Sequence, residues 1–148
     1  ERRGSAISSR RDKERVDQLR ALADGILVGG RTLLDEQPKL TVKSEALREG
    51  RVQRGVSPNP VKVGVVTVAD IALDSDFIKV GPARVVIFTT SQTSIPQLES
   101  LRSLGVEVFV DDAPRVDLHN MMLTLKKIGV DHLMVEGGGT MNFELMRL

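Results

Sequence analysis

Short apolar runs alternate with helical segments along the second half of the chain, and this alternation restricts the possible folds more than any other feature. The runs are rich in β-branched residues and lie at 61–68, 84–89, 106–110 and 131–135. Strands that alternate with helices predict an α/β fold, with a mostly parallel sheet flanked by helices. In such sheets, ligands bind beyond the carboxyl ends of the strands.

The helices between these runs have recognisable starts. Ser94, followed three residues later by Gln97, has the pattern of a capping box. Asp117 is the expected cap of the next helix. The apolar residues of that helix recur at helical spacing and predict its core face: Leu118, Met121, Met122, Leu125 and Ile128.

The rest of the chain has local patterns that predict the remaining elements. Ser9 is a typical helix cap, and Asp12 would lie in the first turn of the helix it starts. The later elements predicted are a buried strand at Gly25–Gly29, a short helix at Thr32–Glu36, an extended piece at 40–42, a polar surface loop at 44–60 and a final helix at 140–148.

A run of glycines follows the last predicted strand. Gly137, Gly138 and Gly139 precede Thr140, whose hydroxyl adds a further hydrogen-bonding group. Backbone N–H groups at the start of a helix attract anions, and glycine lets a phosphate approach closely. The pattern is neither a Walker A loop nor GxGxxG. The glycines by themselves are equally consistent with a phosphate site and with a tight connection that binds nothing.

Two further groups of polar residues follow predicted strands. Glu136 ends the last predicted strand. A carboxylate at the end of a buried strand needs a polar partner or has a functional role. It either accepts bonds from nearby backbone N–H groups or serves substrate binding and proton handling. A turn, a hydroxyl, a carboxylate and a cation gather between Gly29 and Lys43, and composition alone favours an ordinary polar loop for this segment.

Composition excludes several classes of function. The 148 residues suit one domain, and 41% hydrophobic residues are enough for a core. A net charge of +1 and the lack of Trp and Tyr argue against a nucleic-acid binder. Without cysteine there is no disulfide or thiol nucleophile, and two histidines make a His-rich metal site improbable.

The sequence shows no recognisable targeting signal. No apolar run approaches the length of a membrane span, and no signal peptide is visible, so we expect a cytoplasmic protein without a membrane partner. The chain does not begin with Met and stops inside the helix predicted at 140–148. We therefore expect residues 1–148 to form a single domain that is incomplete at both ends.

A series of blocks carries a resemblance over nearly the whole chain: Gly4-Ser5-Ala6-Ile7-Ser8-Ser9, Asp12 with Leu19-Arg20-Ala21, Asp24-Gly25-Ile26-Leu27-Val28-Gly29, Thr32-Leu33-Leu34, Pro38-Lys39-Leu40-Thr41-Val42 and Glu136-Gly137-Gly138-Gly139-Thr140-Met141-Asn142. The order and spacing of these blocks resemble those of the reductases of riboflavin biosynthesis. That family includes the archaeal and fungal diaminopyrimidine reductases and the C-terminal domain of the bacterial bifunctional deaminase–reductase. The archaeal-type branch matches best, because Ala6 stands where the bacterial domain usually has Trp.

The resemblance implies a dihydrofolate-reductase-like fold, a homodimer and NADPH as the cofactor. It implies reduction of the ribosylamino side chain of a pyrimidine 5′-phosphate to the ribitylamino form, with hydride delivered to the sugar C1′. By position, the residues expected to touch the cofactor are Thr32, Glu36, Thr67, Gly137, Gly138, Gly139 and Thr140. Those expected on the substrate side are Ser5, Arg20, Leu40, Lys43 and Glu136. Glu136 and Asp12 are the candidate catalytic residues, and no metal is implied.

The chain also departs from the family pattern. Glu36-Gln37 stands where the family usually has Asp-Asp, Lys43 replaces Arg or His, and Val66 replaces Asp in many members. The family's first strand would precede Glu1, and further strands would follow Leu148. Two alternatives therefore stay open: a reductase of another pterin or pyrimidine, and a nucleotide-binding module that has lost catalysis, for which Gln37 is the hint.

Overall fold

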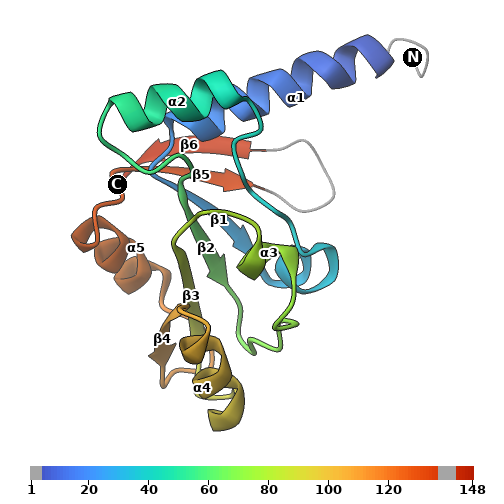
Figure 1. The fold of residues 1–148 in the computed structure, drawn as a ribbon. Helices are drawn as coiled ribbons and strands as arrows, with labels where there is room; N and C mark the ends of the chain where they lie inside the picture. Colours follow the sequence, from blue (N-terminus) through green and yellow to red (C-terminus); the bar gives the residue numbers. More distant parts are fainter. Residues whose placement is uncertain (1–4, 137–142) are drawn as a thin grey trace.

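The computed structural model describes the backbone of residues 5–136 and 143–148 and the side chains of residues 13–136 and 144–148. The strands are β1 (Gly25–Gly29), β2 (Val61–Val65), β3 (Val85–Thr90), β4 (Glu107–Asp111), β5 (His132–Glu136) and β6 (Phe143–Arg147). The helices are α1 (Ser5–Leu22), the π-helical turn η1 (Thr32–Glu36), α2 (Glu45–Gln53), α3 (Asp76–Lys79), α4 (Ile95–Ser103) and α5 (Leu118–Lys127). Figure 1 shows their arrangement.

The described strands form one six-stranded sheet in the order β4-β3-β2-β1-β5-β6. Strands β1 to β5 run parallel, and β6 pairs antiparallel with β5. The chain moves outward from β1 to β4, and α5 then returns it to the other side of β1. The direction of progress thus reverses between β1 and β5, which is the topological switch point of the sheet.

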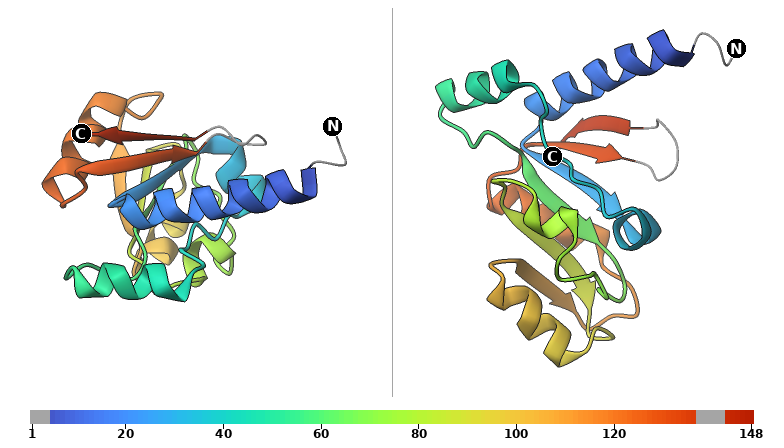
Figure 2. Two further views of the ribbon diagram at one scale, coloured as in Figure 1. Left: turned by 90° about the horizontal axis from the view of Figure 1, so that it is seen from above. Right: turned by 45° about the vertical axis from the view of Figure 1, so that its right-hand side comes forward.

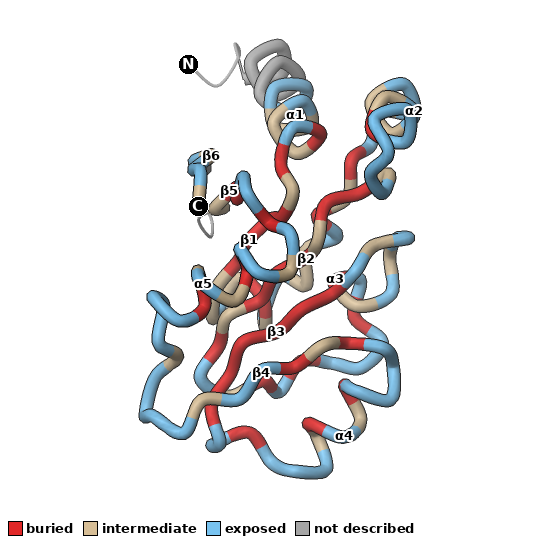
Figure 3. Tube along the Cα trace, turned by 90° about the vertical axis from the view of Figure 1, so that its left-hand side faces the viewer, coloured by how far each residue is buried: buried red, intermediate tan, exposed pale blue. Residues whose placement is uncertain are grey.

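Alternate residues of β1, β3 and β5 contribute to two apolar layers, one on each face of the sheet. In β1, Ile26 and Val28 face the layer that packs against α1, α3 and α4, whereas Leu27 faces the layer of α5. Figure 2 shows α1 and α5 on opposite sides of the sheet. Figure 3 shows the buried strands enclosed by exposed connections. Each large apolar side chain buried this way contributes about 1.5–3 kcal/mol, so the continuous apolar runs explain the buried sheet.

The predicted caps of α4 and α5, Ser94 and Asp117, are confirmed. Ser94 Oγ accepts a hydrogen bond from the Gln97 N–H at 3.3 Å, and an Asp117 carboxylate oxygen accepts from Asn120 N–H at 3.1 Å. The Gln97 side chain does not complete the capping box, because its Nε2 donates to the carbonyls of Ala69 and Ile71 instead. Gln97 thereby ties α4 to the connection that follows β2.

The helix predicted at 140–148 is wrong for the described part of that segment, because Phe143–Arg147 forms strand β6. Met and Leu are good helix formers, which explains the prediction. The outer edge of β5 needs a partner for its backbone groups, and pairing with β6 satisfies them. Leu145 packs against one apolar layer and Leu148 against the other, which adds a packing gain that a local pattern cannot show.

Other boundaries also differ from the local patterns. Helix α1 begins at Ser5 rather than Ser9, β2 ends at Val65, and Leu118 is exposed instead of lying in the core. The segment predicted as extended at 40–42 is not a strand, and Leu40 has a left-handed backbone with φ of 55°. Bulky residues are rarely left-handed, so no local rule anticipates that turn.

The loop predicted at 44–60 contains helix α2, which begins at the Ser44 cap and packs beside α1. Arg51 explains why this polar helix docks there. Its side chain is 4% exposed and donates to the carbonyls of Ala21 and Ala23 at the end of α1, each at 2.8 Å. Carbonyls at a helix C-terminus lack partners within the helix, and a cation suits that end of the helix dipole. Burial lowers the pKa of Arg51 below its ordinary value.

A lysine lies in the core of the sheet. Lys62 of β2 is fully buried, and its Nζ donates to the carbonyls of Asp76, Phe77 and Val80 around α3. Burial lowers the pKa of the Lys62 ammonium to about 8, against the opposing effect of Asp76. The carbonyls of a helix as short as α3 thereby gain a donor that its own turns cannot provide.

We predict that Lys62 makes stability rise with pH on the alkaline side. Between pH about 8 and 10.5 the unfolded chain keeps the Lys62 proton and the folded chain loses it, so raising the pH favours folding. The free energy of unfolding should gain about 1.4 kcal/mol per pH unit from this group across that window. Urea unfolding of the wild type and Lys62→Met at several pH values should show this difference in slope.

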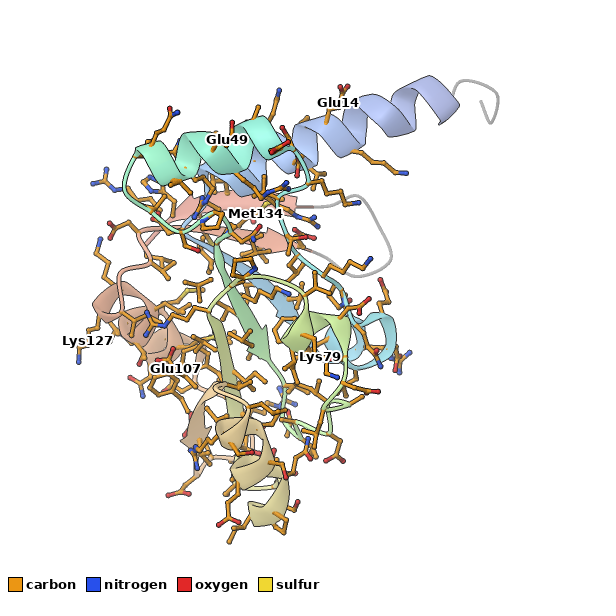
Figure 4. All side chains as sticks on the ribbon, in the orientation of Figure 1. Glu14, Glu49, Lys79, Glu107, Lys127 and Met134 are labelled. Carbon is orange, nitrogen blue, oxygen red and sulfur yellow. The ribbon has the colours of Figure 1, made fainter. Side chains whose placement is uncertain are left out.

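The matched control is Lys79→Met, because Lys79 of α3 is exposed (Figure 4). Its pH dependence should follow that of the wild type. Parallel curves for the wild type and Lys62→Met would contradict the assignment.

Candidate active site

The carboxyl ends of β1, β2 and β5 meet at one edge of the sheet, at the switch point. Leu27 pairs with Val135, so Gly29 and Glu136 end neighbouring strands at this edge. A reversal of strand order leaves the crevice in which open α/β sheets bind ligands. A groove of about 470 Å³ opens at the same edge, lined by residues that follow β1 and β2: Gly30, Arg31, Leu34, Asp35, Val66, Thr67 and Val68.

The turn η1 forms one wall of this groove because Leu33 anchors it to the sheet. Leu33 is fully buried against Gly64 of β2, where an added Cβ atom would lie 2.7 Å from Leu33 Cδ2. Glycine at this position therefore permits the close approach. Thr32 and Glu36, two of the predicted cofactor residues, both lie in η1, half-buried and exposed respectively, but neither lines the groove.

Buried threonines fix the opposite wall. The Thr67 carbonyl accepts bonds from Thr89 Oγ1 at 3.0 Å and from Thr90 Oγ1 at 2.7 Å. Thr93 Oγ1 accepts the Ala69 N–H at 2.9 Å and also bonds to Thr89. These contacts hold the Thr67 backbone, while the Thr67 side chain is left exposed at the groove. Thr67, a predicted cofactor residue, thus has a fixed backbone and an accessible side chain.

A two-pronged ion pair joins α1 to the end of β5. Arg20 donates from Nε and Nη2 to the two carboxylate oxygens of Glu136, at 3.0 and 3.1 Å. Arg20 Nη1 also donates to the Thr41 carbonyl at 3.3 Å. The two charged side chains are 15% and 17% exposed, so water screens them only partly. The structure therefore brings together Arg20 and Glu136, both predicted on the substrate side. It also places them beside Thr41, which lies between the predicted substrate residues Leu40 and Lys43.

Side chains also hold the segment that carries Lys43. The two carboxylate oxygens of Asp17 accept the N–H groups of Lys43 and Ser44, at 2.6 and 2.8 Å. Arg48 Nη1 donates to the carbonyls of Val42 and Lys43, at 2.7 and 2.8 Å. The Lys43 side chain itself is exposed. The backbone at Lys43 is thus fixed on both its donor and its acceptor side.

The start of this segment is anchored in the core. Leu40 is 1% exposed, so this predicted substrate residue presents little of its side chain to a ligand. The Val42 N–H donates to Asn59 Oδ1 at 2.8 Å, and Asn59 is itself buried. Gln37 has a left-handed backbone with φ of 47°, so the chain turns sharply between η1 and Leu40.

Several predicted site residues lie outside the part of the chain that the structure describes. Ser5 and Asp12 have a described backbone, in α1, but not a described side chain. The glycine turn from Gly137 to Thr140 lies wholly outside the described residues. Their roles stay predictions.

Sequence reasoning missed the residues that organise the site: Asp17, Arg48, Asn59 and the threonines at 89, 90 and 93. Asp17 and Arg20 lie three residues apart on α1, a spacing that places them on one face of a helix. That spacing indicates that the two side chains face the same neighbouring segment, which here is 41–44. The partners themselves lie far away in sequence, so no local pattern identifies them.

Among the described side chains, residues 13–136 and 144–148, no group of three or more His, Cys, Asp or Glu residues is placed to hold a metal ion. Across the described part of the chain, no helix has the length and apolar character needed to cross a membrane.

The sheet order, the antiparallel last strand and the flanking helices define a dihydrofolate-reductase-like α/β fold. The whole chain, residues 1–148, matches the RibD C-terminal domain. The chain therefore belongs to the RibD C-terminal domain family, which confirms the family and fold predicted from the sequence blocks.

Individual relatives agree with this assignment. The chain is 37% identical over 135 residues to the 2,5-diamino-6-ribosylamino-4(3H)-pyrimidinone 5′-phosphate reductase of Archaeoglobus fulgidus, covering 91% of this chain and 61% of that protein. It is 34% identical over 132 residues to the protein of the same name in Aquifex aeolicus, covering 89% and 54%. The chain thus spans little more than half the length of these curated relatives.

Solved structures share the fold. A pyrimidine reductase-like protein from Corynebacterium diphtheriae has a TM-score of 0.68 over 85% of this chain and 54% of that one, at 22% identity. A diaminohydroxyphosphoribosylaminopyrimidine deaminase/5-amino-6-(5-phosphoribosylamino)uracil reductase from Thermotoga maritima has a TM-score of 0.58 over 84% and 30%, at 24% identity.

We predict that the Arg20–Glu136 pair contributes measurably to stability. A double-mutant cycle of Arg20→Met and Glu136→Gln, followed by urea unfolding, should give a coupling of about 1–2 kcal/mol, because the pair is two-pronged and partly shielded. Arg84–Glu107 is the control pair. It is also two-pronged, but its side chains are 44% and 39% exposed. Its coupling should be smaller, under about 1 kcal/mol. Equal couplings for the two pairs would contradict this view of the Arg20 contact.

Proposed function

We propose that the chain is an NADPH-dependent reductase of a ribosylamino-pyrimidine 5′-phosphate, converting the ribosylamino group to ribitylamino. The observation that carries the proposal is the junction of Arg20, Glu136 and Thr41 at the switch point, within a RibD C-terminal domain. Relatives named as reductases of such a pyrimidine support this choice. The homodimer implied by the resemblance stays part of the proposal.

We assign the groove beside η1 to part of a dinucleotide. It opens at the carboxyl ends of β1 and β2, and Arg31 gives its wall a cation suited to a phosphate. We assign Thr67, Thr32 and Glu36 to this cofactor side. We keep the same role for Gly137 to Thr140, which lie outside the described residues. When bound, the nicotinamide supplies a hydride, and the protein contributes orientation.

Arg20 can serve the substrate while it holds Glu136. A guanidinium has five N–H groups. Arg20 uses three of them, one each on Nε, Nη1 and Nη2. The remaining donors suit a phosphate, and the exposed Lys43 ammonium supplies a second cation for the same group.

Glu136 is the group we assign to orienting the sugar and handling the proton. Arg20 bonds to both of its oxygens and so fixes the plane of the carboxylate. A carboxylate has about four lone-pair sites, so each oxygen can still accept from a substrate hydroxyl or ordered water. Glu136→Gln keeps the size but removes the charge, and we expect kcat to fall while NADPH affinity is retained.

The direct test is NADPH oxidation by the purified chain with each of two substrates, the diaminopyrimidinone and the aminouracil 5′-phosphate. We expect oxidation with one of them and none without a pyrimidine. Turnover of only a different pterin or pyrimidine would favour the related-reductase alternative. NADPH binding without any turnover would favour a nucleotide-binding module.

We predict that Lys43→Ala raises KM for the phosphorylated substrate by at least about tenfold, the equivalent of 1.4 kcal/mol, because a phosphate loses a cation. The dissociation constant for NADPH should change little. Lys39→Ala is the matched control, since Lys39 is an exposed lysine four residues before Lys43. If NADPH binding collapses in Lys43→Ala instead, the substrate and cofactor sides are assigned wrongly.

A further inference from the structure

The segment 41–44 is held by side chains instead of by a neighbouring strand. Backbone groups of Thr41, Val42, Lys43 and Ser44 bond to the side chains of four residues from other parts of the chain: Asp17, Arg20, Arg48 and Asn59. Backbone polar groups near the core need partners, and an ordinary connection finds them in water at the surface. Holding this connection with four side chains gives it a fixed shape.

We propose that Asp17 is a positioning residue that sets the direction of Lys43 toward the substrate phosphate. The inference rests on the proposed function, because it assigns Asp17 a part in that same site. Asp17 does not touch the substrate in this account. It acts through the backbone of Lys43.

The geometry at Asp17 favours a rigid backbone at Lys43. Its two oxygens each accept one of two successive N–H groups, those of Lys43 and Ser44, at 2.6 and 2.8 Å. Hydrogen bonds to an ionised acceptor are shorter and stronger than neutral ones. Two contacts on neighbouring peptide groups restrict rotation about the Lys43 backbone, which decides where its side chain leaves the chain.

Helix α1 carries both Asp17 and Arg20, so it connects the Lys43 segment to the Arg20–Glu136 ion pair. Asp17 lies one turn before Arg20 on the same face of α1, and Arg20 contacts Thr41, at the other end of the segment, as well as Glu136. One helix face therefore sets the spacing between Lys43, Arg20 and Glu136. A shift of Lys43 relative to this face would move one cation of the phosphate site away from the other.

The experiment is a double-mutant cycle of Asp17→Asn and Lys43→Ala, read by steady-state kinetics with the pyrimidine phosphate that the wild type reduces. Asparagine keeps the size but offers only one acceptor oxygen. Alone it should raise KM by at least about fivefold, about 1 kcal/mol, with kcat and NADPH affinity changed less than twofold. In the Lys43→Ala background it should have no further effect on KM, because the cation it positions is gone.

Glu14→Gln is the matched control. Glu14 is an exposed carboxylate on α1, three residues before Asp17, and projects away from the sheet (Figure 4). Its kinetics should equal those of the wild type. Hydrogen exchange adds a readout without substrate: the amides of Lys43 and Ser44 should exchange faster in Asp17→Asn and at the wild-type rate in Glu14→Gln.

Arg48→Lys gives a second route if Asp17→Asn fails to fold. It weakens the hold on the Lys43 carbonyl and should also raise KM without lowering NADPH affinity. An unchanged KM in either folded variant, or equal effects of Asp17→Asn with and without Lys43, would overturn the inference alone. Absence of pyrimidine turnover by the wild type would remove the proposed function and this inference with it.

Discussion

The contact between Arg20 and Glu136 joins parts of the chain that are 116 residues apart. It ties the last turns of α1 to the end of β5, and through Thr41 it reaches the connection between η1 and α2. Because β5 is laid beside β1 by the α5 crossover, this contact crosses the switch point of the sheet. The arrangement of cations and carboxylate at the site therefore depends on the whole sheet being assembled in this order.

The site combines two kinds of rigidity. The groove wall at Thr67 is held by buried hydroxyls at the ends of β3, whereas the Lys43 segment is held by charged side chains of α1 and α2. Arg51 supports the second group by capping α1 from α2. For the proposed hydride transfer, both devices serve to orient the reacting groups.

Local patterns predicted β1 to β5 and the starts of η1, α4 and α5, because periodicity and caps are encoded within a few residues. The order and spacing of the sequence blocks predicted the family. They failed where tertiary partners decide. Residues 143–147 contain helix formers but pair with β5, and α2 forms in a polar segment because Arg51 finds carbonyls on α1. Arg20 and Glu136 were predicted as site residues from the resemblance, but their contact was not. Asp17 was missed because its partners lie more than 20 residues away, as the 26-residue separation from Lys43 shows.

The site proposed at the carboxyl edge of β1, β2 and β5 has to bind both NADPH and a phosphorylated pyrimidine. A backbone amide NMR titration with NADPH tests it most directly. The account predicts shifts at Gly30, Arg31, Thr67 and Val68, beside the groove at that edge. Amides at the opposite edge, such as Val61 and His132 at the amino ends of β2 and β5, should not move. Shifts confined to that opposite edge, or to the exposed surface of α5, would contradict it.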